Sequence, residues 1–577
     1  MGLMKTDVLV VGAGPCGLTA ATLLASYGVN AITITRYPAT AHTPRAHITN
    51  IRTVEIFRDM GIEGEVSAAS HPLSFLSNNV MVETLSGTEI ARYKSYGSGS
   101  DRLSDYALAS PCQPVNMPQH IMEPVLLQAA RQRGADIRFS QELVQIEQTP
   151  DKVRAHVRNR ATDEFDIIEA EYVIGADGGR STVAEQLKVR FEGEAGLRSM
   201  VNVWVDADLT KYTAYRPGVL YSVHQVGKHG WTSAGAWICV NPWTDWVFST
   251  PGTAEVPESE LVAKAKRTIG DPEVAIHVKN ISGWEVNHLF AATYRIGRVF
   301  LAGDAAHRHP PSGGLGTNTS VQDAYNLAWK LAFVLKGKAG DALLDTYHDE
   351  RQPIGKFVVE RAMKSLYSMD TVATALGSAG GDTKNAAPPS LADLFADTPN
   401  AAERRRTLAS AVAAQNYRSN ALGVELGQRY QSSAVIDDDT AYPAFERDRE
   451  LYYQPTTHPG ACLPHAWIEH NRKMISTLDA VGGGHFTLIY GIGGSDWASA
   501  AAAMGAEFDI DVRLCAIGYR CEYDDVLGEW TGIREIDDDG ALLVRPDRHV
   551  AWRSAAAPRN GHARILRNAL SAILARN

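Results

Sequence analysis

The sequence predicts an α/β protein that opens with a nucleotide-binding βαβ unit, and three observations lead to this fold class. The motif Gly12-Ala13-Gly14-Pro15-Cys16-Gly17 directly follows a buried-strand pattern. Residues 201–281 alternate in places between apolar and polar side chains, which is typical of an antiparallel sheet. Beyond residue 455, strand and helix patterns alternate and predict a compact α/β unit.

Length and composition are those of a large globular protein. The chain has 577 residues, of which 45% are hydrophobic and 21% charged, and this length suggests three or four folding units. The formal net charge of −10 argues against nonspecific binding of nucleic acid. No apolar run reaches the roughly 18 residues that a membrane helix needs, so we expect a cytoplasmic protein without membrane contact.

The six cysteines are scattered along the chain. They form no C-x-x-C pair, and no histidine cluster has zinc spacing. Reduced thiols and the absence of a metal site are therefore expected.

The first elements are a strand at residues 7–11, a helix at 18–27 and a second strand at 31–35. In this context Gly12 turns the chain, Gly14 leaves room for a pyrophosphate, and Gly17 lets the helix pack on the strand. A dinucleotide site is therefore predicted. An acidic residue is expected at the end of the second strand, but Thr35-Arg36-Tyr37 stands there. Arg36 is compatible with a 2′-phosphate, with a place over the adenine, or with solvent.

A polar, cationic turn at residues 43–50 precedes a helix at 51–60. It contains His47, and a histidine in such a turn is more often structural than catalytic. Residues 71–118 are irregular, and a strand candidate at 80–84 suggests that part of this stretch joins a second sheet. Residues 119–123 lead into a helix that is expected to run to Arg133, with Pro124 tolerable in its first turn.

Two later strands each end at an aspartate. The strand at 166–174 leads into Asp177-Gly178, which alone is typical of a plain turn. The strand at 298–302 leads into Gly303-Asp304, a Pro/Gly-rich loop and a helix at 320–335. Such a carboxylate can accept sugar hydroxyls, and glycines before a helix expose N–H groups to a flat ligand. The alternative is an ordinary turn with Asn318 as a helix cap.

The middle and the end of the chain carry weaker signals. Most aromatic residues of the predicted antiparallel sheet belong to its core, although some are candidates for a substrate pocket. They are Trp204, Tyr221, Trp231, Trp237, Trp243 and Trp246. Residues 371–412 are Gly- and Pro-rich and predict a linker with surface helix. Strands at 485–490, 512–517 and 542–547, with a helix at 497–505, make up the C-terminal unit.

The three motifs at Gly12, Asp177 and Gly303 occur in the order and approximate spacing seen in class A flavin-dependent monooxygenases. Residues 43–50, 307–320 and 450–457 also resemble the phenol hydroxylase branch of this family, over nearly the whole chain. The resemblance implies a discontinuous FAD-binding domain at residues 1–70, 111–190 and 285–370. It further implies a β-sheet substrate domain at 71–110 and 191–284, a linker and helical region at 371–454, and a thioredoxin-like domain at 455–577.

The family's site residues carry over to matching positions of this chain. The resemblance implies FAD contacts from Gly12, Gly14, Gly17, Arg45, Gln119, Asp177, Asp304, Gly314, Leu315 and Gly316. Amides near Leu315 would face the flavin, where the helix dipole stabilises the reduced anion. His47 is the candidate for contact with a phenol oxygen, and Pro311 would lie beside the reactive oxygen. His307 and His309 are expected to stabilise the loop.

The implied reaction is ortho-hydroxylation of a phenol, using NADH or NADPH, O2 and a flavin C4a-hydroperoxide. The same motifs leave open a second enzyme reading, in which a larger polycyclic metabolite is hydroxylated or epoxidised. A non-catalytic FAD-binding protein is the alternative from another class. The C-terminal unit lacks C-x-x-C, so we expect it to be structural or to form contacts in a homo-oligomer.

Overall fold

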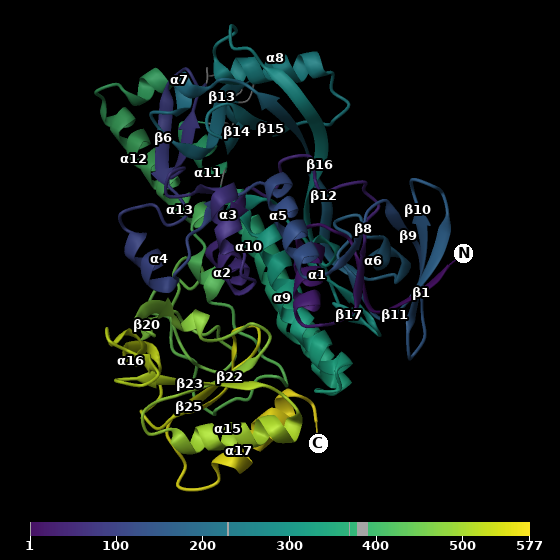
Figure 1. The fold of residues 1–577 in the computed structure, drawn as a ribbon. Helices are drawn as coiled ribbons and strands as arrows, with labels where there is room; N and C mark the ends of the chain where they lie inside the picture. The colour runs from purple at the N-terminus through teal and green to yellow at the C-terminus, as the bar shows by residue number, and fades with distance from the viewer. Residues whose placement is uncertain (1, 228–229, 369, 378–389, 577) are drawn as a thin grey trace.

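The computed structural model describes residues 2–227, 230–368, 370–377 and 390–576. The described residues form three large sheets joined by long helices (Figure 1). In this view the C-terminal sheet lies at the bottom, the sheet containing β13 and β16 at the top, and the β1 sheet to the right. The predicted α/β class is confirmed, whereas the residue boundaries of the domains stay predictions.

The β1 sheet has the strand order β17-β18-β11-β1-β2-β8. Strands β18, β11, β1, β2 and β8 run parallel. Strand β10 pairs antiparallel with β11, and β9 pairs antiparallel with β10. The bounds are β1 Leu3–Val11, β2 Ala31–Ile34, β8 Asp136–Arg138, β9 Gln141–Gln148, β10 Val153–Asn159, β11 Phe165–Gly175, β17 Arg295–Ile296 and β18 Val299–Leu301. Helix α1 (Pro15–Ser26) joins β1 to β2, as the glycine motif predicts.

The second sheet has the order β19-β16-β12-β15-β14-β13-β5-β6 and is antiparallel except between β13 and β5. Its bounds are β5 Asn78–Val82, β6 Glu89–Lys94, β12 Phe191–Asp206, β13 Gly218–Gly227, β14 Gly230–Asn241, β15 Asp245–Pro251, β16 His277–Ala291 and β19 His307–Arg308. β5 and β6 thus join it, as expected from the irregular stretch. Helix α8 (Glu258–Ile269) covers one face, where Tyr221, Trp237 and Trp246 are fully buried core residues. The side chain of Trp231 lies outside the described residues.

Long helices fill the space between the sheets. Helix α9 (Gly316–Leu335) is buried along most of its length, and α10 (Asp345–Ser368) packs beside it. The other helices of the first 430 residues are α2 Ile51–Asp59, α3 Glu63–Ala69, α4 Leu103–Ala109, α5 Gln119–Gln132, α6 Thr182–Gln186, α7 Thr210–Thr213, α11 Asp370–Leu376, α12 Pro399–Ala414, α13 Asn416–Ser419 and α14 Leu422–Leu426. Within the described ranges, no helix has the length and hydropathy needed to cross a membrane.

Two helical regions differ from their sequence predictions. Pro124 is the sixth residue of α5, so the expectation of a proline in the first turn is wrong. Its ring leaves the carbonyl of His120 without a helical N–H partner, a cost that the packing of the helix must offset. The prediction of a linker with surface helix at residues 371–412 is partly wrong, because α11 buries Val372 and Leu376 in a core cluster with Met81 of β5, whereas most side chains of α12 are exposed. Residues 378–389 lie outside the described part of the chain.

A small sheet connects the turn at 43–50 to the chain before α5. Strand β7 (Val115–Asn116) pairs with both β3 (Ile48–Thr49) and β4 (His71–Pro72). The Met117 N–H donates to the His47 carbonyl at 2.7 Å, and the Gln119 N–H donates to the Arg45 carbonyl at 2.7 Å. The turn that carries Arg45 and His47 is therefore held in a fixed register.

The C-terminal unit is a third sheet in the order β21-β20-β24-β23-β22-β25-β26. The parallel strands β22 and β23 are joined by α15, and the antiparallel pair β25–β26 follows, which is the mixed arrangement expected of a thioredoxin-like fold. The bounds are β20 Trp467–His470, β21 Lys473–Ser476, β22 Phe486–Tyr490, β23 Val512–Gly518, β24 Tyr523–Asp524, β25 Ala541–Val544, β26 Val550–Ser554, α15 Ser495–Phe508, α16 Glu529–Ile533 and α17 His562–Ile573.

The turn between β25 and β26, residues 545–548, inserts charged side chains between the C-terminal unit and helices α9 and α10. Arg545 forms two hydrogen bonds to Glu350, at 2.6 and 2.8 Å, and binds Asp547 at 2.6 Å. Lys330 binds Glu350 at 2.7 Å, and all four side chains are buried. The turn therefore joins the two parts of the molecule through balanced, fully desolvated charges.

Candidate active site

The glycine motif forms the loop between β1 and α1. A side chain on Gly12, whose φ is +112°, would lie 2.1 Å from the Ala176 carbonyl oxygen, and one on Gly17 would lie 1.8 Å from the Gly12 carbonyl oxygen. Gly14 differs, because the nearest atom to its added Cβ is Glu123 Oε1 at 3.9 Å. The first and third glycines are thus required by packing, while Gly14 borders open space.

Helices α1 and α9 begin without a side-chain cap. By contrast, α2 and α6 are capped by Asn50 and Ser181. An uncapped helix start leaves N–H groups and the positive end of the helix dipole available to an anionic ligand. Several other described helices, among them α5, α8 and α15, also start without a side-chain cap, so the uncapped starts of α1 and α9 are compatible with a pyrophosphate and an electron-rich ring but do not single these helices out.

Asp304 lies in the short helical turn η1 (Gly303–Ala305), at the end of β18. Its side chain is exposed, yet surrounding protein raises its pKa by desolvation, against the lowering effect of His307, Arg308 and Arg45. A carboxylate that is both accessible and desolvated faces a recess rather than an open surface. This position suits the acceptance of ligand hydroxyls.

A buried ion network supports the Asp304 turn from behind. Asp323 of α9 accepts the Gly303 N–H at 3.0 Å and lies 2.8 Å from His307 Nε2. Its other oxygen accepts Arg351 Nε at 2.8 Å, and Arg351 also donates to the Thr319 carbonyl. His307 therefore stabilises the loop, as predicted. Asp323 and Arg351 were not predicted, although a charged residue on the buried face of an apolar helix is a usable signal.

The loop before α9 contains the predicted residues Pro311, Gly314, Leu315 and Gly316. Pro311 is exposed, and its carbonyl accepts the Gly314 N–H at 3.2 Å. Leu315 is buried, whereas Gly314 and Gly316 are half-buried. A side chain on Gly314 would meet Ile48 at 2.6 Å, so this loop packs against the residue after His47.

Asn318 ties the same loop to the His47 turn. It lies inside α9 and is not its cap, so the alternative of a helix-capping Asn318 is wrong. Its Nδ2 donates to the Ile48 carbonyl at 2.9 Å, and its Oδ1 accepts the Asn50 N–H at 3.0 Å. Asn318 thereby holds the 48–50 segment against the start of α9, although the bonded residues are 268 and 270 positions apart. No local sequence pattern predicts this contact.

His47 is half-buried and has an unusual electrostatic environment. Desolvation, and after it the charge of His120, lower its pKa to about 4, against the opposing effect of a hydrogen bond to the Cys239 backbone. Within the described structure, His47 Nδ1 has no hydrogen-bond partner. The imidazole is therefore neutral at pH 7 and keeps a free lone pair.

Arg45 and Gln119 both act on Glu123, whose Oε1 is the atom nearest to a Cβ added to Gly14. Arg45 is exposed, and Gln119 Nε2 donates to Glu123 Oε1 at 2.6 Å. The buried Glu123, which was not predicted, also accepts the Ala41 N–H. Glu123 thus fixes both Gln119 and the loop after β2 beside Gly14, and its only sequence signal is an acidic residue on the buried face of α5.

Asp177 is placed differently from the other predicted contacts. Its Oδ1 accepts the Ser181 hydroxyl at 2.5 Å and its Oδ2 accepts the Val183 N–H at 3.1 Å. Its carboxylate is thus directed at the start of α6. The preceding carbonyl of Ala176 packs against Gly12, so the Asp177 turn still borders the glycine loop.

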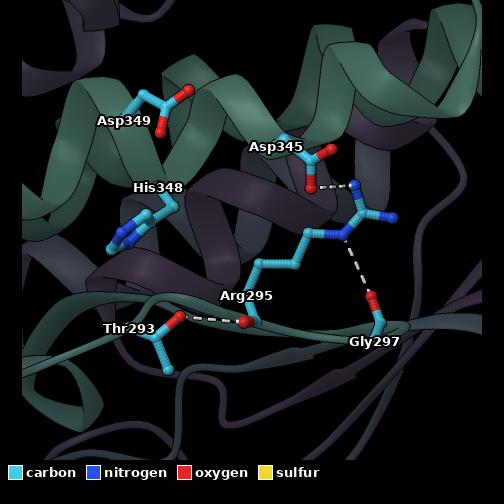
Figure 2. A pocket seen from close by; sticks show the side chains of 6 residues that line it. All are labelled: Thr293, Arg295, Gly297, Asp345, His348 and Asp349. Atoms are coloured by element: carbon cyan, nitrogen blue, oxygen red, sulfur yellow. Dashed lines mark hydrogen bonds and ion pairs between the residues drawn. The ribbon is translucent and has the colours of Figure 1, made fainter.

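Two surface pockets lie near the β1 sheet. One of about 520 Å³ is lined by Gly179, Arg180, Ser181, Ala184, Glu185, Lys188, Val189, Phe191 and Arg308, and is mainly basic. The other, of about 480 Å³, is lined by the six residues drawn in Figure 2. There Arg295 is already paired with Asp345 at 2.8 Å and with the Gly297 carbonyl, and no predicted site residue takes part. We assign that second pocket no catalytic role.

One group in the described structure has metal-ligand geometry, namely Asp437, Asp438 and His458. Both His458 nitrogens face carbonyl oxygens, at 3.1 and 3.0 Å, and Asp438 is bound by Arg553 and Thr440. These ligand atoms are already engaged, so the group is better explained as an ion-pair cluster.

Comparison with known proteins agrees with this geometry. Residues 5–362 match the family model described as "FAD binding domain", and residues 456–577 match "Aromatic-ring hydroxylase, C-terminal". The chain is 41% identical to 2,4-dichlorophenol 6-monooxygenase of Delftia acidovorans, over 99% of this chain and 98% of that protein.

Solved structures match over the full length as well. The flavin-dependent monooxygenase PieE, in complex with FAD and substrate, is 42% identical with a TM-score of 0.94, over 100% of both chains. Aklavinone-11 hydroxylase, in a ternary complex with FAD and aklavinone, is 30% identical with a TM-score of 0.80, also over 100% of both chains.

Proposed function

Because the chain belongs to the FAD-binding aromatic-ring hydroxylases, we propose that it hydroxylates a phenolic substrate ortho to the hydroxyl group. NADH or NADPH and O2 are the co-substrates. Bound FAD supplies the redox chemistry, taking a hydride from the nicotinamide and activating O2. The observation that carries the proposal is the Asn318 bridge, because it holds the His47 turn against the loop that carries Pro311 and opens α9.

The chain's own residues hold the cofactor in this proposal. The open side of Gly14 and the uncapped start of α1 receive the pyrophosphate, with Arg45 and Gln119 beside it. Asp304 accepts hydroxyls of the sugar-like chain. Leu315 and Gly316 direct the start of α9 at the ring, where its dipole favours negative charge.

His47 is proposed to orient the phenol. Its neutral ring accepts a hydrogen bond from the phenol hydroxyl, which raises electron density on the aromatic ring. With phenol near pKa 10 and His47 near 4, complete transfer of the proton to His47 is uphill by about 6 units, roughly 8 kcal/mol. His47 therefore accepts a hydrogen bond from the phenol and does not take up its proton. Pro311, on the loop before α9, is proposed to border the space that the phenol occupies.

The basic pocket beside Asp177 is proposed to receive the nicotinamide co-substrate. Arg180, Lys188 and Arg308 supply positive charge there, with Glu185 as the acidic residue. Arginine and lysine suit phosphate groups. Asp177 is proposed to order this pocket, because its carboxylate forms hydrogen bonds with Ser181 and Val183 at the start of α6.

The decisive experiment is NADH or NADPH oxidation by the purified protein, with bound flavin confirmed by absorbance. We expect phenols to stimulate oxidation and to gain one oxygen ortho to the hydroxyl, as found by mass and regiochemistry. Hydrogen peroxide as the only product would reject simple phenols as substrates. No oxidation under any condition would favour the non-catalytic FAD-binding alternative.

A polycyclic substrate is the second candidate, and the match to aklavinone-11 hydroxylase favours it. Turnover of polycyclic phenols without turnover of small phenols would select this alternative. A cytoplasmic location and a homo-oligomeric state remain expectations, to be tested by fractionation and by light scattering.

A further inference from the structure

Asn116 connects the turn that carries His47 to the second sheet. Its backbone pairs with Ile48 of β3 and with His71 of β4. Its side chain is fully buried, and Nδ2 donates to the Cys239 carbonyl of β14 at 3.1 Å. Asn116 therefore pairs through its backbone with the residue after His47 and bonds through its side chain to the second sheet.

Cys239 lies where β14 leaves its regular ladder. The pairing of β13 with β14 ends at Ile238, which lies opposite Leu220, and the pairing with β15 shifts in register between Cys239 and Asn241. Irregularities of this kind are frequent next to active sites, where they redirect a strand. The Cys239 carbonyl can therefore accept donors from side chains outside the sheet, as it does from Asn116.

The His47 ring uses the same backbone group. Burial lowers the pKa of His47, and a hydrogen bond between the ring and the Cys239 backbone opposes this shift. A bond that favours the protonated ring has the ring nitrogen as donor and the carbonyl oxygen as acceptor. Because a carbonyl oxygen has two lone pairs, it can accept from Asn116 and from His47 together.

Packing alone does not account for an asparagine at position 116. The side chain is 0% exposed, yet within the described residues its Oδ1 has no hydrogen-bond partner. A buried polar atom without a partner lowers stability, and an apolar side chain of the same branched shape would avoid this loss. The asparagine is therefore better explained by what its Nδ2 does at the Cys239 carbonyl.

We propose that Asn116 is a positioning residue, which holds the Cys239 carbonyl where it fixes the tautomer and the orientation of His47. A neutral imidazole has one N–H and one lone pair, and the carbonyl that accepts the N–H decides which nitrogen keeps the lone pair. That lone pair accepts the phenol hydroxyl in the proposed function, on which this inference rests. Asn116 acts through His47 and is assigned no contact with the substrate.

The test is a double-mutant cycle of Asn116→Leu and His47→Asn in the FAD-loaded protein, with kcat/KM for phenol as the first readout. Asn116→Leu alone should lower kcat/KM about tenfold, as expected for one lost hydrogen bond. In the His47→Asn background it should have almost no effect, because Asn116 acts through His47. The melting temperature of Asn116→Leu should not fall. Asn116→Asp, which keeps the size of the side chain, replaces it in the cycle where leucine prevents folding.

The second readout reports the His47 tautomer without turnover. Binding of phenol and of its methyl ether, anisole, is measured from the change in flavin absorbance of the oxidised holoenzyme. Phenol can donate a hydrogen bond to a lone pair, whereas anisole cannot. The wild type should therefore bind phenol more tightly, and Asn116→Leu should lower this preference toward that of His47→Asn.

Asn79→Leu is the matched control. Asn79 of β5 is also buried and has an unpaired Oδ1 within the described structure, but its Nδ2 bonds to Ser419 and Tyr93. Its effect on kcat/KM should be the same with and without His47.

Equal losses for Asn116→Leu in both backgrounds, or an unchanged preference for phenol over anisole, would overturn the inference. The proposed function would then stand if His47→Asn alone still lowers phenol turnover. If the wild type neither binds nor hydroxylates any phenol, the proposed function fails and this inference fails with it.

Discussion

Replacing Arg545 by methionine should uncouple the C-terminal unit from the two long helices. The wild-type cluster contains two cations, Lys330 and Arg545, and two anions, Glu350 and Asp547, all buried. Methionine fills much of the same volume but removes one cation, so one negative charge stays buried without compensation. Breaking a buried pair in this way costs about 3–5 kcal/mol.

The assay is urea denaturation of the FAD-loaded protein, followed by circular dichroism. Arg406→Met serves as the control, because its partner Glu403 and Arg406 itself are 66% and 69% exposed, and a surface pair contributes about 0–1 kcal/mol. The double variant Arg545→Met with Glu350→Gln again balances the remaining charges, so it should lose less stability than the sum of the two single variants. A loss below about 1 kcal/mol for Arg545→Met, or strict additivity, would refute this reasoning.

His47→Asn should retain FAD, because His47 is not among the proposed cofactor contacts. Its kcat/KM for phenols should fall by about 10²–10⁴. Unchanged turnover and an unchanged pH profile would remove His47 from the mechanism. Gly14→Val should weaken FAD binding in a flavin fluorescence titration without unfolding the protein, because Gly14 borders open space. Gly17→Val should prevent folding, because a side chain there would meet the Gly12 carbonyl oxygen. Equal behaviour of the two variants would contradict this. Burial raises the pKa of Glu425 from 4.5 to about 7, so the contribution of Glu425 to the unfolding free energy should fall by roughly 3 kcal/mol as pH rises through this range. In urea denaturation, the difference in unfolding free energy between the wild type and Glu425→Gln should change by about this amount between pH 5 and pH 8, and an identical pH dependence of the two proteins would disprove it.

The elements that follow local rules were predictable. The glycine motif needs its strand and helix within a few residues, and the structure has both at the expected places. The strand, loop and helix around Asp304 and the α/β unit beyond residue 455 follow the same logic. These patterns are set by hydrophobic periodicity and by glycine, which act over short stretches of chain.

The contacts that assemble the site were not predictable, because they join distant residues. Asn318 is a residue type that often caps helices and lies near a helix start, yet its side-chain amide forms hydrogen bonds with the backbone of residues 48 and 50. Asp323 and Arg351 are recognisable only as charges on buried helix faces, whereas His307, which binds Asp323, was expected to stabilise the loop from its place in the motif. The partners of the 545–548 turn lie about 200 or more residues away, so its role depends entirely on tertiary packing.

A cofactor bound at the starts of α1 and α9 would link the stability of the protein to the supply of that cofactor. A cofactor that occupies both helix starts binds the native state and not the unfolded chain, which adds about 2.7 kcal/mol of stability at a concentration of 100 times Kd. Flavin supply during synthesis therefore acts as a folding determinant. In cells short of flavin, the apoprotein would lack both catalysis and this stabilisation, so we expect it to be degraded faster than the FAD-loaded protein.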